Sequence, residues 1–181
     1  MAKQKIKKST QVAMGGLISA LSIVIMFLTG LIPFGEYAFP AFAGLVLISI
    51  VVDVNFKTAM VVYVAVSILG LFVVPVKESA ILFLFFFGFY PSIYLQLNRI
   101  KSKPLKVIVK FLIFNVCVIT AYLIFINLFS SPEEFMEFGR YTAYIMLALG
   151  NIFFVIYDLA VKSSYFLYIY KIRPKVIKKI K

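Results

Sequence analysis

Residues 9–27 read STQVAMGGLISALSIVIMF, and this stretch decides the class of fold because it is apolar enough to lie in lipid. A helix of about 20 apolar residues spans the roughly 30 Å of hydrocarbon in a bilayer. The stretch is longer than the apolar region of a signal peptide, and no small-residue cleavage pattern follows it. We therefore expect a membrane-spanning helix that is retained rather than cleaved.

The composition of the whole chain leads to the same prediction. Its 181 residues are 63% hydrophobic with a mean hydropathy of +1.03, and only 14% of them are charged. A soluble domain carries about a quarter charged residues. The sequence therefore predicts an all-α membrane protein, a single domain over residues 1–181 with basic tails at about 1–10 and 171–181.

Six apolar segments are candidate membrane spans, and we expect six transmembrane helices in one bundle. The segments are residues 12–32, 39–54, 56–74, 79–97, 105–129 and 141–170. The second and third are separated only by the sequence VDVNFK, which predicts a tight turn rather than a loop.

The basic residues are divided unequally between the two sides of this arrangement. One side holds 17 of the 19 Lys and Arg residues, around the two termini, in the VDVNFK turn, in the loop at 98–106 and at Lys110, which is counted with that loop. The other side holds only Lys77 and Arg140, together with five of the seven acids. The positive-inside rule then places both termini in the cytoplasm and the segment 130–140 outside. We expect the chain to lie in the plasma membrane of a bacterial cell.

Several kinds of chemistry are not expected from this sequence. It has no histidine and a single cysteine, Cys117, so it predicts neither a metal site nor a disulfide framework. No nucleotide-binding glycine motif is present, and no polar residues stand at a catalytic spacing, so we expect no cofactor and no enzymatic activity. Basic loops beside anionic lipid headgroups explain the formal charge of +12 without a nucleic-acid partner.

The sixth span carries polar side chains on one helical face. Their spacings are 7, 7 and 4, and they are Tyr144, Asn151, Asp158 and Lys162. Asp158 and Lys162 are predicted to form a structural ion pair near the cytoplasmic boundary. Tyr144 and Asn151 lie nearer the middle and the outer leaflet, so they are the better candidates for contact with a ligand.

Two short segments on the outer side supply the other candidate ligand residues. The sequences IPFGEYAFP and VPVKES place charged and aromatic groups at the mouth of the bundle. These groups either line a pocket that opens outward or are solvated turn residues. A small-molecule site needs a few converging polar groups beside aromatic rings. The predicted substrate-binding residues are therefore Glu36, Tyr37, Lys77, Tyr144 and Asn151.

The fourth span contains an unusual run of aromatic residues, LFLFFFGFYPSIY. Gly88 and Pro91 interrupt the run, and Pro91 predicts a kink because it removes a backbone hydrogen bond. Phe83, Phe87 and Tyr90 share one helical face. They either face lipid or form an aromatic wall beside a cavity.

The first span has a stripe of small residues on one face, Ala13, Gly16 and Ala20, which Val24 and Phe27 continue. Small residues let two helix backbones approach closely, and such packing holds helices together in a membrane. The small-residue stripe (Ala13, Gly16 and Ala20) is therefore a predicted helix interface. Its partner is either another span of the same chain or a helix of a second protein.

In size, span number, basic N-terminus and this stripe, with GLISA at 16–20, the chain resembles the substrate-binding S-component of energy-coupling factor transporters. The resemblance covers the whole chain at the level of architecture. It implies a subunit that captures a micronutrient such as a vitamin from outside. It also implies docking through span one onto a transmembrane coupling subunit that two cytoplasmic ATPases drive.

A different class of function is also compatible with this architecture. The chain is similar in size and span number to the small rod-shape-determining membrane proteins of bacterial cell-wall machinery. Such a scaffold needs lateral interfaces in the bilayer but no ligand pocket. The sequence leaves these two functions open.

Overall fold

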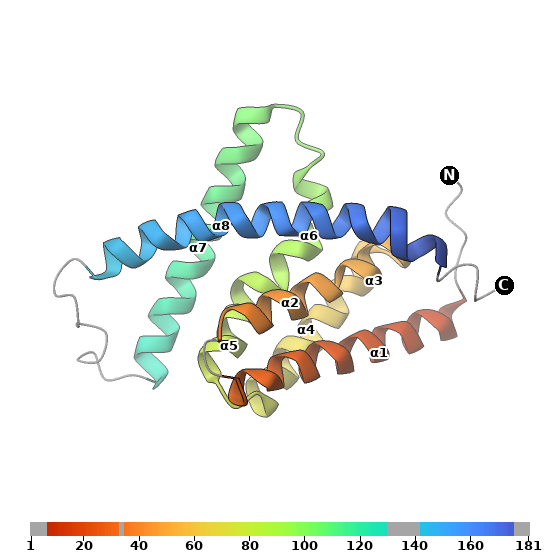
Figure 1. The fold of residues 1–181 in the computed structure, drawn as a ribbon, viewed down its shortest axis with the longest axis horizontal. Helices are drawn as coiled ribbons and strands as arrows, with labels where there is room; N and C mark the ends of the chain where they lie inside the picture. Colours follow the sequence, from red (N-terminus) through yellow and green to blue (C-terminus); the bar gives the residue numbers. More distant parts are fainter. Residues whose placement is uncertain (1–6, 33–34, 130–141, 176–181) are drawn as a thin grey trace.

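The computed structural model describes residues 7–32, 35–129 and 142–175, and helices form nearly all of this part of the chain (Figure 1). Five helical segments are long and apolar enough to cross a membrane. They are Lys8–Gly30, Phe56–Val73, Lys77–Leu97, Lys103–Ile124 and Tyr144–Lys175. The prediction of an all-helical, membrane-embedded chain is confirmed at this level. The predicted outer segment 130–140 and much of the two basic tails lie outside the described residues.

The elements follow the predicted segments closely. In chain order they are α1 (Lys8–Phe27), η1 (Leu28–Gly30), α2 (Ala38–Val46), α3 (Ile48–Asp53), α4 (Phe56–Val73), α5 (Lys77–Leu82), η2 (Phe83–Phe87), α6 (Phe89–Leu97), α7 (Lys103–Phe129), α8 (Thr142–Leu167) and η4 (Tyr168–Ile172). Both η2 and η4 are single turns of π-helix.

The second predicted span differs from a regular transmembrane helix. It is a shorter apolar helix, Ala38–Asp53, and it is broken at Leu47 into α2 and α3. At the break the Ser49 hydroxyl donates a hydrogen bond to the carbonyl of Val46 at 2.8 Å. A side-chain donor thus supplies a hydrogen bond to the backbone where the helix is interrupted.

The turn between α3 and α4 is as tight as the sequence predicts. Only Val54 and Asn55 separate the two helices. The side chain of Asn55 accepts a hydrogen bond from the backbone N–H of Thr58 at 2.8 Å, which caps the start of α4. On the other side of this turn, Asp53 forms an ion pair with Arg173 at 2.9 Å and accepts a hydrogen bond from Tyr168. These contacts hold the turn against the end of α8.

The fourth span is interrupted where its sequence predicts a kink. Its π-helical turn η2 ends just before Gly88, and Pro91 occupies the first turn of α6. Since Pro91 has no N–H, the carbonyl of Phe87 loses its regular helical donor. The Tyr157 hydroxyl of α8 donates to that carbonyl at 3.1 Å instead. A tyrosine from a neighbouring helix thereby satisfies a backbone group that lipid could not.

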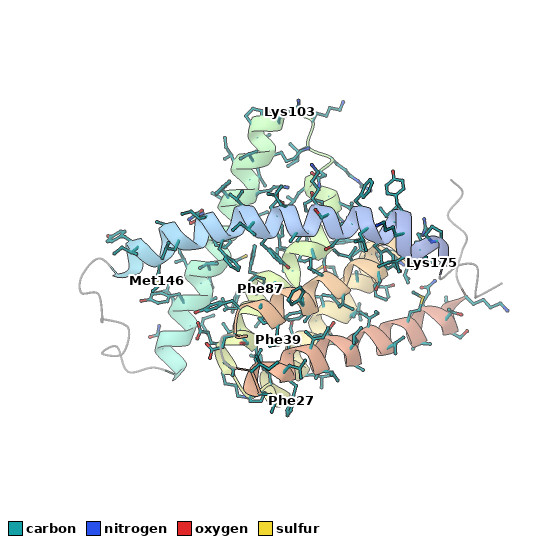
Figure 2. The ribbon with its side chains drawn as sticks, in the orientation of Figure 1. Phe27, Phe39, Phe87, Lys103, Met146 and Lys175 are labelled. Atoms are coloured by element: carbon teal, nitrogen blue, oxygen red, sulfur yellow. The ribbon has the colours of Figure 1, made fainter. Side chains whose placement is uncertain are left out.

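The same carbonyl fixes the position of α2. A Cβ atom added to Gly44 would overlap the Phe87 carbonyl oxygen and lie 2.7 Å from its carbonyl carbon. Only glycine permits this approach of two backbones. Figure 2 shows Phe87 in the middle of the helices, between α2 and α8. The Pro91 interruption and Gly44 together form the centre of the fold.

Aromatic rings fill the space around this centre. Phe114 of α7 stacks on Phe154 of α8 with ring centroids 4.8 Å apart, and Phe86 meets Phe114 edge-on at 5.1 Å. The run in the fourth span points inward, since its members Phe83, Phe87 and Tyr90 are all buried. Of the two interpretations of that run, the structure therefore excludes the lipid-facing one.

The remaining helices surround this core unevenly (Figure 1). Helix α1 packs along α2 and α4 on one side of the molecule. Helix α8 lies on the other side of α2, and α7 crosses α8 steeply so that the ends of the two helices diverge. The seam between α7 and α8 is consequently confined to a short stretch.

Candidate functional site

Helix α1 packs on the rest of the chain through one face only. Gly15, Ser22 and Met26 are buried on this face. The Ser22 hydroxyl donates a hydrogen bond to the Ala43 carbonyl of α2 at 3.2 Å. A Cβ added to Gly15 would lie 3.2 Å from the side chain of Val62 on α4. These contacts account for the internal packing of α1.

The small-residue stripe lies on a different face of α1 and is exposed. The exposed surface of α1 includes Ala13, Gly16 and Ala20, and Val24 and Phe27 continue it. A Cβ added to Gly16 would meet nothing within 4 Å. Of the two partners that the sequence allows for the stripe, a span of the same chain is therefore excluded among the described residues.

A shallow groove borders the stripe and makes this surface concave. It has a volume of about 450 Å³ and lies between α1 and α4. Gly16 and Ser19 line it from α1, whereas Val61 and Ala65 line it from α4. Small and β-branched side chains of this kind leave room for the ridge of a further helix.

The predicted ligand residues Glu36 and Tyr37 are hydrogen-bonded to the start of α5. The Tyr37 hydroxyl donates to the Glu78 carboxylate at 3.0 Å, and the Ser79 hydroxyl donates to the Glu36 carbonyl at 2.8 Å. Burial raises the pKa of the Tyr37 phenol above its usual value, and the charge of Glu78 raises it further. The phenol thus stays protonated and keeps its role as donor.

Lys77, predicted as a third outer ligand residue, has a structural role in this arrangement. Its ammonium donates to the carbonyls of Leu71 and Val74 at 2.9 and 3.0 Å. These carbonyls belong to the last turn and the C-cap of α4, where a cation is favourable. The Lys77 charge is used at the end of a helix rather than in a pocket.

Tyr144 and Asn151 do not join the outer residues. Tyr144 is 72% exposed on the surface of α8. Asn151 exchanges two hydrogen bonds of 3.0 Å with Asn115 of α7, so the pair forms a closed amide dimer between the helices. The five predicted substrate-binding residues therefore do not converge on one site.

The ion pair predicted within α8 is wrong. Asp158 pairs with Lys110 of α7, with Nζ and Oδ1 2.6 Å apart, and not with Lys162. The Lys110 side chain is 9% exposed and that of Asp158 is 26% exposed. Tyr90 of α6 donates a second hydrogen bond to the carboxylate, and Lys110 lies 4.6 Å from the centroid of the Tyr94 ring. Asp158 is therefore paired with the buried Lys110 of α7, and the exposed Lys162, one turn along α8, is not its partner.

These contacts form a polar seam between α7 and α8, made of the pairs Lys110–Asp158 and Asn115–Asn151. The stacked rings of Phe114 and Phe154 lie between the two pairs along the helices. Sequence reasoning assigned Lys110 to the cytoplasmic loop charges and so missed its role. The available signal was its position inside the fifth predicted span, where a charge needs a partner.

Removing one amide of the polar seam is expected to destabilise the protein. Asn151→Leu leaves the Asn115 amide without its partner between two helices, at a cost of about 1–2 kcal/mol in unfolding free energy. The double variant Asn115→Leu/Asn151→Leu should recover part of that loss. The measurement is thermal unfolding of the purified protein in detergent.

Asn127→Leu is the matched control, because the exposed Asn127 amide bonds, among the described residues, to the Leu123 carbonyl of its own helix. Its unfolding temperature should stay close to that of the wild type. Equal losses for Asn127→Leu and Asn151→Leu would contradict the amide pair as an interhelical contact.

A second groove, the lateral groove, lies between α1, α2 and the last turns of α8. Its volume is about 680 Å³, and most of its lining side chains are aliphatic or aromatic. Three serines and one tyrosine interrupt this lining, namely Ser49, Ser163, Ser164 and Tyr168. None of the predicted substrate-binding residues lines it.

Within the described ranges, no three His, Cys, Asp or Glu side chains are placed to hold a metal ion. Comparison with known proteins gives no relative, because no protein-family model, no curated protein and no solved structure matches the chain. Function must therefore be inferred from the residues and geometry of the chain itself.

Proposed function

We propose that this chain is a membrane subunit that works in a complex, and that the small-residue stripe of α1 receives a transmembrane helix of its partner. The observation that carries the proposal is the free space beside Gly16, where an added Cβ meets no atom within 4 Å. The internal contacts of α1 use Gly15 and Ser22 instead. The small-residue stripe is thus exposed, whereas another face of α1 already packs against α2 and α4.

The specific form of the proposal is a substrate-capturing subunit of an ATP-driven micronutrient importer, like the S-components of energy-coupling factor transporters. The partner is then the transmembrane coupling subunit with its two cytoplasmic ATPases. The resemblance supplies the small-molecule cargo, and the exposed stripe supports the docking. The chain lies in the plasma membrane of a bacterial cell in this proposal.

The proposal includes six membrane crossings with both termini in the cytoplasm. Helices α2 and α3 form the remaining crossing, and their 16 residues rise about 24 Å at 1.5 Å per residue. Their burial in the bundle supports so short a crossing, since Ala43, Leu47, Ile48 and Ile50 are all buried. The Asp53–Arg173 ion pair supports placing the α3–α4 turn and the end of α8 on the same side.

A membrane scaffold, resembling the small rod-shape-determining proteins, is the second candidate function. The observation in its favour is the filled interior. Rings from α6, α7 and α8 pack against one another between the helices, and the predicted ligand residue Asn151 is hydrogen-bonded to Asn115. A scaffold uses the same exposed stripe but needs no cargo.

Purification from the native membrane in mild detergent separates the two functions. We expect two ATPases and a transmembrane subunit to co-purify with the tagged chain, and mass spectrometry of the extracted complex to find a bound micronutrient. Cell-wall synthesis proteins in their place would support the scaffold. A chain that purifies without any protein partner would contradict both forms of the proposal.

A further inference from the structure

The lateral groove between α1, α2 and α8 has apolar walls and one wall with polar groups. Its walls include Ile25 and Leu28 of α1 and Phe42 of α2, which make most of it as apolar as lipid tails. The α8 wall is different, because Ser163 and Ser164 lie there side by side. The groove therefore offers an apolar channel with two hydroxyl groups on its α8 wall.

These hydroxyl groups are unused within the described part of the chain. Neither Ser163 nor Ser164 has a hydrogen-bond partner there, whereas Ser49 across the groove bonds to the Val46 carbonyl. Polar groups at membrane depth gain from finding a partner, because lipid tails offer none. A ligand with acceptor oxygens beside its apolar chain fits this wall.

Positive charge follows the groove residues along the chain. The π-helical turn η4 brings Tyr168 and Ile172 to the groove, and Lys171 stands in this turn and Lys175 just beyond it. Lys171 and Lys175 are exposed and form no ion pair with described residues. Figure 2 shows Lys175 at the C-terminal end of this helical segment, beyond η4. Asp53, the acid nearby, is already neutralised by Arg173.

We propose that the lateral groove binds one anionic glycerophospholipid. An acyl chain lies along the apolar walls, the ester oxygens accept hydrogen bonds from Ser163 and Ser164, and Lys171 and Lys175 hold the phosphate. Lys171 follows Ser164 by seven residues, about 10 Å along the helix. A long lysine side chain can extend toward Ser164, so its ammonium group lies closer to the hydroxyl than the backbones do. Because the groove uses Ile25 and Leu28, the small-residue stripe of α1 stays free.

The test uses the purified full chain, washed free of lipid in detergent, with thermal unfolding measured as lipid is added. Phosphatidylglycerol is compared with phosphatidylcholine of the same acyl chains. We expect phosphatidylglycerol to raise the unfolding temperature at a mole fraction at least tenfold lower. Native mass spectrometry should show one such lipid per chain.

Two variants with a matched control locate the headgroup. A basic residue near the membrane surface is worth about 1 kcal/mol toward anionic lipid, which corresponds to about fivefold per lysine. Lys171→Gln/Lys175→Gln should therefore need about 25 times more phosphatidylglycerol. Lys162→Gln removes the same charge from the same helix but on another face, and should behave as wild type. If Lys162→Gln and the Lys171→Gln/Lys175→Gln variant lost the same affinity for phosphatidylglycerol per lysine removed, the effect would come from diffuse surface charge. That result would overturn the proposal.

A third variant locates the acyl chain. Ser164→Phe places a ring in the groove and should abolish the response to both lipids while the lipid-free unfolding temperature is kept. If that variant does not fold, Ile25→Phe narrows the groove from the α1 wall and is used instead. A full response in a folded, groove-filled variant would overturn the proposal, as would equal binding of the two lipids by the wild type.

Discussion

Gly44→Ala is expected to destabilise the protein by more than about 3 kcal/mol, although it adds a single methyl group. The added Cβ would overlap the Phe87 carbonyl oxygen. That oxygen cannot yield, because it belongs to helix backbone that the Tyr157 hydroxyl also holds, at 3.1 Å. Separating α2 from the fourth span would also disturb the aromatic core, so the loss is shared by several contacts.

The measurement is the unfolding temperature of the purified variant, with the yield of monodisperse protein as a second readout. Gly16→Ala is the matched control, since it makes the same change in a helix where the Cβ meets nothing within 4 Å. It should leave stability unchanged or slightly higher, because alanine is the better helix former. Similar losses in the two variants would show that the close approach of α2 to Phe87 is wrong.

Breaking the Lys110–Asp158 ion pair is expected to produce the second large loss. Lys110→Met leaves the Asp158 carboxylate among helices without its cation, and Asp158→Asn leaves the Lys110 ammonium without its anion. Removing one partner of a buried pair costs about 3 kcal/mol or more. The double variant Lys110→Met/Asp158→Asn should regain much of the loss, because no uncompensated charge remains and the introduced amide can still accept the hydrogen bond from Tyr90.

This cycle also distinguishes the two possible partners of Asp158. Lys162 lies one helical turn beyond Asp158 in the sequence, but it is exposed and unpaired among the described residues. Lys162→Met should therefore leave the unfolding temperature unchanged. A loss in Lys162→Met as large as that in Lys110→Met would instead restore the pair within α8.

Much of the fold follows from the apolar segments and from the residues that end or interrupt them. The lengths of the runs predict the long helices α1, α4, α7 and α8 to within a few residues. The sequence VDVNFK predicts the tight turn before α4, and Gly88 with Pro91 predicts the interruption of the fourth span. These features depend on local physics, namely helix length, capping and the missing N–H of proline.

Contacts between distant segments could not be predicted in the same way. The role of Gly44 depends on the Phe87 carbonyl, which lies 43 residues further along the chain. Asp158 has one candidate cation on its own helix and another on α7, and spacing alone favours the local one. Burial decides for Lys110, because a lysine enclosed among helices needs a counter-charge.

The candidate site shows the same division between local and distant information. The stripe at Ala13, Gly16 and Ala20 is predicted by helical periodicity, and its exposure required the structure. The ligand residues were chosen as polar groups on favourable faces. Asn151 instead pairs with Asn115, and Lys77 binds the end of α4. Polar residues in a span form hydrogen bonds within the protein when a partner is near. Their positions in the sequence do not show which of them have such a partner.

The most direct test of the docking face is the Gly16→Leu variant in the native membrane. The size of the complex is measured after mild detergent extraction, and the unfolding temperature of the isolated chain is measured in parallel. We predict that Gly16→Leu remains folded with an unchanged unfolding temperature but migrates alone, whereas Gly16→Ala still assembles. An intact complex in Gly16→Leu, or a loss of stability in the isolated variant, would contradict the assignment of this face to a partner.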